Sequence, residues 1–562
     1  MMGVAIMRAR LADEQLREVA LCGAASAGLS ALIVLALPRG GDLAAHLYRT
    51  ELVQHGNLVW DNLWFAGQYP LASYSLLYYP LAAVVGNATL GVGGVVIAAG
   101  VFASVAYREW ARVGRWPARS FAVLLTGQVF TGAYPYDIGL ASLLATVWAL
   151  QRRRVWLAAA AALVTMGLSP LAFLFLGLAL CALSLRRRSL GRQTLFVAAA
   201  VALGAGLELA VLLLLPSPGM VYPYGTLRLL AGIGVSALGV ALSLRGRGGW
   251  PLASIFLVWA SASLVLAAIP SPVGHNLVRA DVFVVPLMLV AASRADFRPR
   301  WLATAAIGLA LVANVGPYLS MIPDRSSSPD ARLSFWAPVI RYLRTHLTAQ
   351  FRVEVVPTAN HWESYYLPRA GIPLARGWYR QLDIADNGPL YAATLTPVDY
   401  RAWLRQHGVR FVVLPHLPLE PVGAKVDGRE ARLVASRRSG LRTVLRLPSA
   451  TVFELPNPTP LLTGPAPAAV TFLQSSRITG YVDKPGIYFL RVHYSPYWSV
   501  TGGSVCPASG RNAMTWIRVA RPGRFSIQAA ETPGAVLARV FDNDTHQCRS
   551  ADRMSRPTSN ER

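Results

Sequence analysis

The amino-acid sequence predicts an α-helical polytopic membrane protein of about eleven transmembrane helices, followed by a C-terminal extracytoplasmic region that is mixed α/β and then a β-sandwich. Three observations predict this fold class. Only 14% of the 562 residues are charged and 54% are hydrophobic, whereas soluble chains carry about a quarter charged residues. Apolar runs alternate with short Arg clusters through residues 1–320. After about residue 321, short β-type runs are separated by Gly, Pro and Asp.

The first apolar run, from about Val19 to Leu37, follows three Arg residues. It is longer than the apolar part of a usual signal peptide and no small-x-small cleavage motif precedes Pro38, so we interpret it as a retained span. The further spans predicted from apolar runs are 88–107, 120–133, 138–150, 155–168, 171–185, 194–215, 227–244, 251–269, 278–293 and 301–320.

Arg clusters set the predicted orientation. Clusters such as 108–119, 152–154 and 186–192 follow the even-numbered spans, while the opposite loops hold few basic residues. This bias predicts a cytoplasmic N-terminus and an outer location for everything after about Met321. Counting the aromatic segment 71–86 as a span would reverse the first of these loops, so we interpret it as a helix at the outer interface.

The net charge of +25 does not indicate a nucleic-acid partner. Nucleic-acid binders gather basic residues on one soluble face, whereas many Arg residues here lie in short loops between apolar runs. The predicted partners are therefore membrane lipids. The sequence holds no Walker loop, dinucleotide fingerprint or Cys/His metal cluster, which disfavours an ATP-driven pump.

Four regions are predicted along the chain. They are a transmembrane domain (1–320, with a first outer loop at 38–87), an extracytoplasmic mixed α/β region (321–460), an extracytoplasmic β-sandwich (461–548) and a disordered tail (549–562). Cys506 and Cys548 lie on the predicted outer side, where disulfides persist, and we predict that they pair. Cys22 and Cys181 fall in apolar helices, where a lone Cys usually acts as a small hydrophobe.

Candidate chemistry gathers in the first outer loop. Asp42, His46 and Arg49 recur at i, i+4 and i+7, so on a helix they share one face. A carboxylate can act as a general base on a sugar hydroxyl and an Arg can hold a phosphate. Spacing alone nevertheless favours an amphipathic helix with a solvated polar face. The interleaved aromatic residues, which suit stacking against sugar rings or lipid, are Trp60, Trp64 and Tyr69.

The motifs of this loop carry a resemblance. Gly41-Asp42 is followed by His46, then by Trp60-Asp61, Gly67-Gln68-Tyr69-Pro70 and Tyr78-Tyr79-Pro80-Leu81. The loop resembles that of the GT-C superfamily of polytopic, polyprenyl-phosphosugar-dependent glycosyltransferases, and more narrowly of bacterial and archaeal membrane proteins with a Gly-Asp…His loop. The predicted helix count, cytoplasmic N-terminus and large outer C-terminal domain agree with that family.

The resemblance implies roles for two acids. An acidic residue of this loop serves the superfamily as catalytic base or metal ligand, which implies Asp42 as the base. Asp61 is the second choice, as base, metal ligand or acceptor contact. The family often has two adjacent acids, whereas Leu43 follows Asp42 here. Metal dependence is therefore in doubt, and the cofactor is left open, with a divalent cation as one option.

Further candidates lie at other predicted outer ends. Arg279, with His275 nearby, could hold the donor phosphate, and an interfacial Arg279–Asp281 ion pair is the equal alternative. The turn holding Tyr134, Tyr136 and Asp137 is more simply a polar turn. Glu208 lies inside a predicted span, where an acid is either functional or a helix-packing group.

In the predicted outer domain, His361 and Glu363 stand within Asn360-His361-Trp362-Glu363, and Ala375-Arg376-Gly377-Trp378 follows. Such clusters of aromatic, acidic and cationic groups suit carbohydrate binding. A buried structural Trp with ion-paired neighbours is the equal alternative.

The resulting expectation is an inverting glycosyltransferase of EC class 2.4 in the bacterial plasma membrane. It would move a sugar from a polyprenyl-phosphate donor to an envelope glycan, lipid or protein on the outer face. The alternatives are a non-enzymatic lipid or glycolipid transporter or flippase, and a catalytically inactive envelope-assembly scaffold. The few polar residues inside the predicted spans leave no evident hydrophilic path for transport.

Overall fold

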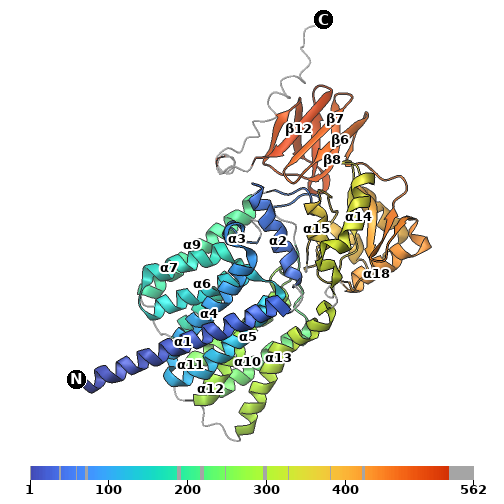
Figure 1. Ribbon diagram of the computed structural model, residues 1–562. Helices are drawn as coiled ribbons and strands as arrows, with labels where there is room; N and C mark the ends of the chain where they lie inside the picture. The colour runs from blue at the N-terminus through green and yellow to red at the C-terminus, as the bar shows by residue number, and fades with distance from the viewer. Residues whose placement is uncertain are drawn as a thin grey trace. The chain divides into compact units, whose positions relative to one another are not determined.

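The computed structural model divides into two compact units (Figure 1). Unit 1 comprises Met1–His46, Tyr74–Leu213 and Met220–Ser328, and unit 2 comprises Leu47–Ser73, Leu214–Gly219 and Pro329–Arg562. The residues that the structure describes are 2–36, 40–57, 60–69, 74–186, 192–215, 220–246, 249–294, 300–326, 328–379, 381–419, 424–530 and 534.

Unit 1 is helical, and within the described residues each segment predicted to be a span is α-helical apart from its ends, except 278–293, which begins in a 3-10 segment. Long apolar runs favour helices because a helix satisfies its backbone hydrogen bonds within itself, so that its apolar side chains can face other helices or lipid. The helices are α1 (Met2–Ala36), α2 (Gly41–Gln54, which continues into unit 2), α3 (Tyr78–Val85), α4 (Asn87–Trp110), α5 (Arg115–Thr131), α6 (Tyr134–Gln151), α7 (Val155–Leu168), α8 (Pro170–Arg186), α9 (Arg192–Leu214), α10 (Thr226–Leu244), α11 (Trp250–Ala268), α12 (Val284–Arg294) and α13 (Arg300–Ser326). The 3-10 segments η1 (Ala111–Gly114) and η2 (Gly274–Phe283) precede α5 and α12.

Six helical segments of the described chain are long and apolar enough to cross a membrane, which makes this a helical membrane protein with a β-rich C-terminal region. One of them, Asn87–Thr131, contains both α4 and α5. Three shorter apolar helices are Val155–Leu168, Pro170–Leu185 and Ala303–Gly316. The predicted count of about eleven spans is not confirmed, because several of the predicted helices are shorter than about twenty residues.

Ion pairs hold α1 against the Arg cluster that precedes and begins α5. Arg112 and Arg115 each pair with Glu14, at 2.7 and 2.9 Å, and Arg119 pairs with Glu18 at 2.7 Å. In the sequence, these Arg residues indicated membrane orientation alone. The structure adds that they anchor the first helix, so the beginning of α1 lies at the same end of the bundle as the α4–α5 turn.

In the longest segment of unit 2, helix α14 (Leu333–His346) is followed by a mixed four-stranded sheet of order β1-β2-β4-β3. β1 (Arg352–Val355) pairs with β2 (Val409–Pro415) in parallel, whereas β4 (Ala450–Glu454) is antiparallel to both β2 and β3 (Arg442–Arg446). The connection from β1 to β2 contains α15 (Glu363–Arg369), α16 (Ile384–Tyr391) and α17 (Pro397–Gln406), and α18 (Ala424–Ala435) follows β2. Tyr400, Trp403 and Val412 centre its apolar core.

The C-terminal strands form two four-stranded antiparallel sheets, ordered β10-β11-β8-β5 and β6-β7-β12-β9. In strands such as β8 and β12, alternate residues are buried, which is the pattern of a sheet with one apolar face. The strands are β5 (Leu462–Thr463), β6 (Ala468–Leu473), β7 (Arg477–Val482), β8 (Gly486–His493), β9 (Trp498–Gly502), β10 (Val505–Ser509), β11 (Met514–Val519) and β12 (Gly523–Ala529).

Two predictions fall on the C-terminal end of the chain. Cys506 is buried in β10, but its predicted partner Cys548 lies outside the described residues, so the disulfide stays a prediction. The tail 549–562 also lies outside them.

Candidate functional site

An ion pair between distant segments marks the candidate site in unit 1. Asp42 is the second residue of α2, and its Oδ2 accepts a hydrogen bond from Arg279 Nη2 at 2.7 Å. The two residues are 237 positions apart, and Arg279 stands in η2. Asp42 also lies in the first turn of its helix, where the helix dipole favours a negative charge. The structure therefore pairs Arg279 with Asp42, and not with Asp281 as the alternative expectation had it.

Close packing of two glycines positions the beginning of α2. A Cβ at Gly40 would lie 2.3 Å from the carbonyl oxygen of Phe130, at the end of α5. Gly132, which caps α5 with φ +79°, leaves only 2.8 Å between such a Cβ and the amide nitrogen of Leu43. Because no side chain fits at either position, the end of α5 holds the first turn of α2, and with it Asp42, in place.

Arg279 retains unused hydrogen-bonding capacity. Its Nε donates to Asn276 Oδ1 at 3.3 Å, and its guanidinium lies 5.9 Å from the Tyr136 ring centre. Tyr136 and Gln128 donate to its backbone carbonyl instead. A guanidinium has five N–H donors, and within the described part of the chain Nη1 makes no hydrogen bond. The Arg279 side chain is thus held through Nε and Nη2, while Nη1 can still donate hydrogen bonds.

Asp137 provides an acid beside this pair. It stands in the first turn of α6, it is fully buried, and it lies close enough to Arg279 and Asp42 to interact with their charges. Neither of its carboxyl oxygens accepts a hydrogen bond from any described residue. Buried polar groups are normally satisfied by protein or ordered water. Asp42, Asp137 and Arg279 therefore form a cluster of charged groups, in which Arg279 Nη1 and the Asp137 carboxyl make no hydrogen bond to a described residue.

His46 continues the polar face of α2 but contacts tyrosines. Its Nδ1 lies 3.1 Å from Tyr79 Oη, and its ring packs at 5.1 Å from that of Tyr74. Tyr78, beside it, donates to Asn87 Oδ1 at 2.8 Å. The tyrosine-proline motif at the beginning of α3 therefore surrounds the imidazole.

His275 lies in η2 with Arg279. Its ring is 5.2 Å from that of Tyr222, and it lies within range of the charges of Arg228 and Arg279. Within the described part of the chain, Glu208, in α9, makes no hydrogen bond or ion pair with these residues, and it lies in a candidate span. The structure thus brings Asp42, Asp137 and Arg279 together, with His275 adjacent.

The second predicted acid, Asp61, belongs to unit 2 and organises a turn. Its carboxylate accepts from the Tyr48 hydroxyl at 3.2 Å and from the Leu63 amide at 3.1 Å, while its backbone pairs with Gln68. Burial, followed by the charge of Asp61, raises the pKa of Tyr48 well above its usual value. This geometry suits a structural acid that shapes the loop.

The predicted aromatic residues of the loop are buried within unit 2. Trp60 donates from Nε1 to Asn62 and packs edge-on against Trp498 at 5.5 Å. Trp64 donates to the carbonyl of Ser364. Three further contacts complete this packing: Arg49 over the Trp64 ring at 5.6 Å, Tyr69 Oη with Ser495 Oγ at 2.8 Å, and Gly377, whose absent Cβ would lie 2.6 Å from Trp64.

His361 and Glu363 form a buried pair in the same unit. His361 Nδ1 lies 3.1 Å from Glu363 Oε1, and Glu363 Oε2 accepts from the Thr358 hydroxyl at 2.7 Å. His361 has φ +53°, a left-handed conformation that costs about 1–3 kcal/mol for a non-glycine residue. The surrounding contacts hold this conformation in place.

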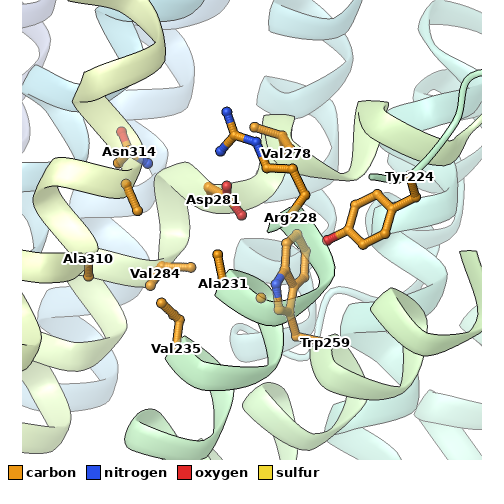
Figure 2. A pocket seen from close by; sticks show the side chains of 12 residues that line it. Tyr224, Arg228, Ala231, Val235, Trp259, Val278, Asp281, Val284, Ala310 and Asn314 are labelled. Atoms are coloured by element: carbon orange, nitrogen blue, oxygen red, sulfur yellow. The ribbon is translucent and has the colours of Figure 1, made fainter. Parts of the chain in front are cut away.

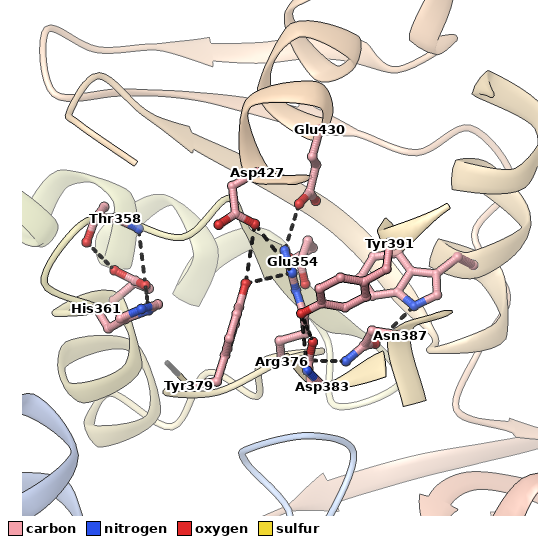
Figure 3. A network of polar contacts seen from close by, with 12 residues as sticks. Glu354, Thr358, His361, Arg376, Tyr379, Asp383, Asn387, Tyr391, Asp427 and Glu430 are labelled. Carbon is pink, nitrogen blue, oxygen red and sulfur yellow. Dashed lines mark hydrogen bonds and ion pairs between the residues drawn. The ribbon is translucent and has the colours of Figure 1, made fainter. Parts of the chain in front are cut away.

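A larger buried network surrounds Arg376 (Figure 3). Its Nη2 donates to Glu354 Oε1 at 2.5 Å and to Glu430 Oε2 at 2.7 Å, and its Nη1 donates to Tyr379 Oη at 2.7 Å. Asp427 Oδ1 lies 3.9 Å from Nη1. Burial raises the pKa of Glu354 well above its usual value, although the charge of Arg376 opposes the rise.

Sequence reasoning missed parts of both arrangements. It singled out Arg376 but not Glu354, Asp427 or Glu430, which reach it from β1 and α18. It treated Asp137 as a turn residue. A signal existed for Asp137, because it adjoins the predicted span 138–150 and an acid within a membrane span is a functional candidate.

Among the residues that the structure describes, no group of three or more His, Cys, Asp and Glu side chains could hold a metal ion. In comparisons with known proteins, no family model matches this chain, and no curated protein matches it either.

Proposed function

We propose that this protein is a GT-C-like membrane glycosyltransferase, which moves a sugar from a polyprenyl-phosphate donor to a cell-envelope acceptor. The supporting observation is the Asp42–Arg279 pair, in which Arg279 keeps free donors next to a buried acid. A guanidinium with open N–H groups suits a phosphate, and a carboxylate beside it suits a base. The motif resemblance of the loop after α1 independently favours Asp42 as that base.

The proposed reaction exchanges one ion pair for another. The donor phosphate binds the guanidinium of Arg279 and weakens its hold on Asp42. Asp42 then accepts the proton of the acceptor hydroxyl while the hydroxyl oxygen attacks the anomeric carbon. The bond between that carbon and the phosphate oxygen breaks, and polyprenyl phosphate leaves with its charge held by Arg279. One displacement inverts the anomeric centre.

The proposed orientation places this chemistry outside the bacterial plasma membrane. In an eleven-span arrangement the N-terminus is cytoplasmic, and both the segment after α1 and the C-terminal domain are extracytoplasmic. The contacts of α1 support it: Glu14 and Glu18 meet the Arg cluster at one end of the bundle, whereas Asp42 follows α1 at the other. The C-terminal β-rich region would help to hold the glycan, lipid or protein acceptor.

Transfer can be tested with membranes that contain the full-length protein and a radiolabelled polyprenyl-phosphosugar. Asp42→Asn keeps the shape of the side chain and an oxygen for Arg279 but removes the base. We expect transfer to fall by about 10²–10⁴-fold, the usual contribution of a general base. The matched control is Asp13→Asn, because Asp13 forms an exposed pair with Arg17, and this variant should transfer at the wild-type rate.

The other outcomes separate the rival functions. Normal transfer by Asp42→Asn would remove Asp42 from the role of base. Movement of labelled lipid across the membrane without transfer would favour a flippase. Full rescue of the cell envelope by a variant without transfer would favour an assembly scaffold.

A further inference from the structure

A second polar site lies in unit 1, in a pocket outside the Asp42–Arg279 pair (Figure 2). Residues from α10, α11, η2, α12 and α13 line it, and the space among them, including its opening, is about 430 Å³. Most of the lining helices belong to candidate membrane spans.

The pocket is polar at one end and apolar at the other. On α10, Arg228 is followed two turns later by Val235, and seven residues of helix span about 10 Å. Asp281, in η2, is followed by the apolar residue Val284 at the beginning of α12. On α13 the order is reversed, because the polar residue Asn314 comes after the apolar residue Ala310 in the sequence. Each wall therefore has its polar group at the same end, as the labelled side chains in Figure 2 show.

The polar end presents opposite charges that do not pair. Arg228 lies close enough to Asp281 for their charges to attract. Yet neither side chain forms an ion pair or hydrogen bond with any described residue, and neither does the buried amide of Asn314. A cation and an anion held apart at the head of an apolar slot are complementary to a ligand that carries both charges.

We propose that this pocket binds the headgroup of a zwitterionic phospholipid, with part of one acyl chain in its apolar end. The lipid phosphate would accept hydrogen bonds from Arg228, as phosphates do from guanidinium groups. The lipid ammonium would donate to Asp281, and Asn314 would bind an ester carbonyl. A lipid with an anionic headgroup alone would leave the carboxylate of Asp281 facing a second negative charge. This inference does not depend on the proposed transfer reaction.

Native mass spectrometry of the full-length protein in detergent can test the proposal. The probes are phosphatidylethanolamine and phosphatidylglycerol with identical acyl chains, so that only the ammonium group differs. We expect retention of one phosphatidylethanolamine, with at least a tenfold preference, since a charge-assisted hydrogen bond typically contributes about tenfold or more. Asp281→Asn should abolish the preference but keep residual binding, and Arg228→Gln should weaken both lipids by about tenfold or more.

A pair of neighbouring substitutions controls for bulk. Ala313→Phe fills the pocket and should abolish retention of both lipids, whereas Val312→Phe, on the 68% exposed neighbour, should leave retention unchanged. Equal retention of the two lipids by the wild type would overturn the proposal. So would retention that survives Ala313→Phe, or displacement of both lipids by farnesyl phosphate, which would make the pocket a prenyl-phosphate site.

Discussion

Arg279 and Arg376 are both guanidinium groups held by buried acids, yet they differ in how far their hydrogen bonds are satisfied. Arg376 donates from every nitrogen and is 3% exposed. Arg279 donates from Nε and Nη2 only, within the part of the chain described, and its side chain is 18% exposed. The acids differ too, because Glu354 and Glu430 both contact Arg376, whereas Asp137 stands near Arg279 with its oxygens open.

If the proposed function is right, the difference separates a structural ion pair from a catalytic one. A saturated buried network gains nothing from a ligand and loses much when one member is removed. An unsaturated pair leaves donors and acceptors for something that is bound only part of the time. The comparison therefore predicts that changes at Arg376 affect folding, whereas changes at Arg279 affect activity.

The largest effect on stability is expected from Arg376→Gln. It leaves the buried side chains of Glu354 and Glu430 without the cation that they contact, and removing one partner of a buried pair costs about 3–5 kcal/mol. Proteolysis of the full-length protein in detergent across a urea series measures this loss in unit 2. The matched control is Arg369→Gln, whose 52% exposed side chain pairs with Glu51 and should cost less than about 1 kcal/mol. Equal costs at the two positions would contradict the structural role of Arg376.

Arg279→Gln is expected to have the opposite profile. Removing a donor that stabilises charge in a transition state typically lowers the rate by about 10²–10³-fold. We expect that loss in the sugar-transfer assay, together with a resistance to proteolysis close to that of the wild type. A variant that unfolds and loses transfer in parallel would place Arg279 in the same structural class as Arg376. Arg300→Gln, on an exposed residue at the beginning of α13, is the control for the lost positive charge.

The sequence predicted helices well because the relevant information is local. The bounds of a predicted span such as 194–215 agree with those of its helix to within a few residues. Both signals, the apolar run and the Arg residues that flank it, lie within about twenty positions of the sequence. The number of spans was harder to predict, because length alone does not separate a crossing helix from one buried among its neighbours. Sequence likewise named Arg279 and Asp42 separately but not as a pair, because 237 positions separate them.

The aromatic residues of the loop show a different limit. Ligand binding by Trp60, Trp64 and Tyr69 stays a prediction, and the sequence did not reveal that these residues are buried against other residues of unit 2. Spacing reveals which side chains share a face but not what covers that face. The contact of Trp64 with Gly377, for example, joins segments more than three hundred positions apart and leaves no local trace.

The support beneath Asp42 can be tested at Gly132. In Gly132→Ala the new Cβ meets Leu43 at 2.8 Å, and φ stays at +79°. We expect a cost of about 1–3 kcal/mol and a transfer rate lower than that of the wild type, because the first turn of α2 must move. Gly93→Ala is the control, since nothing lies within 4 Å of its added Cβ. A wild-type transfer rate for Gly132→Ala would show that the position of Asp42 does not depend on this contact.

The smallest expected effect is a dependence of stability on pH that comes from Glu354. Burial raises the pKa of Glu354 above its usual 4.5, so the folded state binds the proton more tightly than the unfolded state does. The stability that this proton contributes is complete below about pH 4.5 and is lost as the pH rises through the raised pKa, by at most about 1.4 kcal/mol per pH unit. Glu354→Gln should flatten that part of the curve.

A carboxyl whose pKa is shifted in the opposite direction provides the control for this dependence on pH. In Glu454 burial opposes ionisation, but hydrogen bonds from Arg442 and Arg410 outweigh it and lower the pKa. Its contribution is therefore present above its usual pKa and lost as the pH falls, so Glu454→Gln should change the acid side of the curve. Urea unfolding followed by proteolysis, with an acid protease at the low end, from about pH 2.5 to pH 8 compares the two variants. Because burial also raises the pKa of Asp383, a residual slope in Glu354→Gln should disappear when Asp383→Asn is added. If the dependence of stability on pH is unchanged in the double variant, neither Glu354 nor Asp383 binds a proton in the folded state over this pH range. The Arg376 network would then hold both acids ionised.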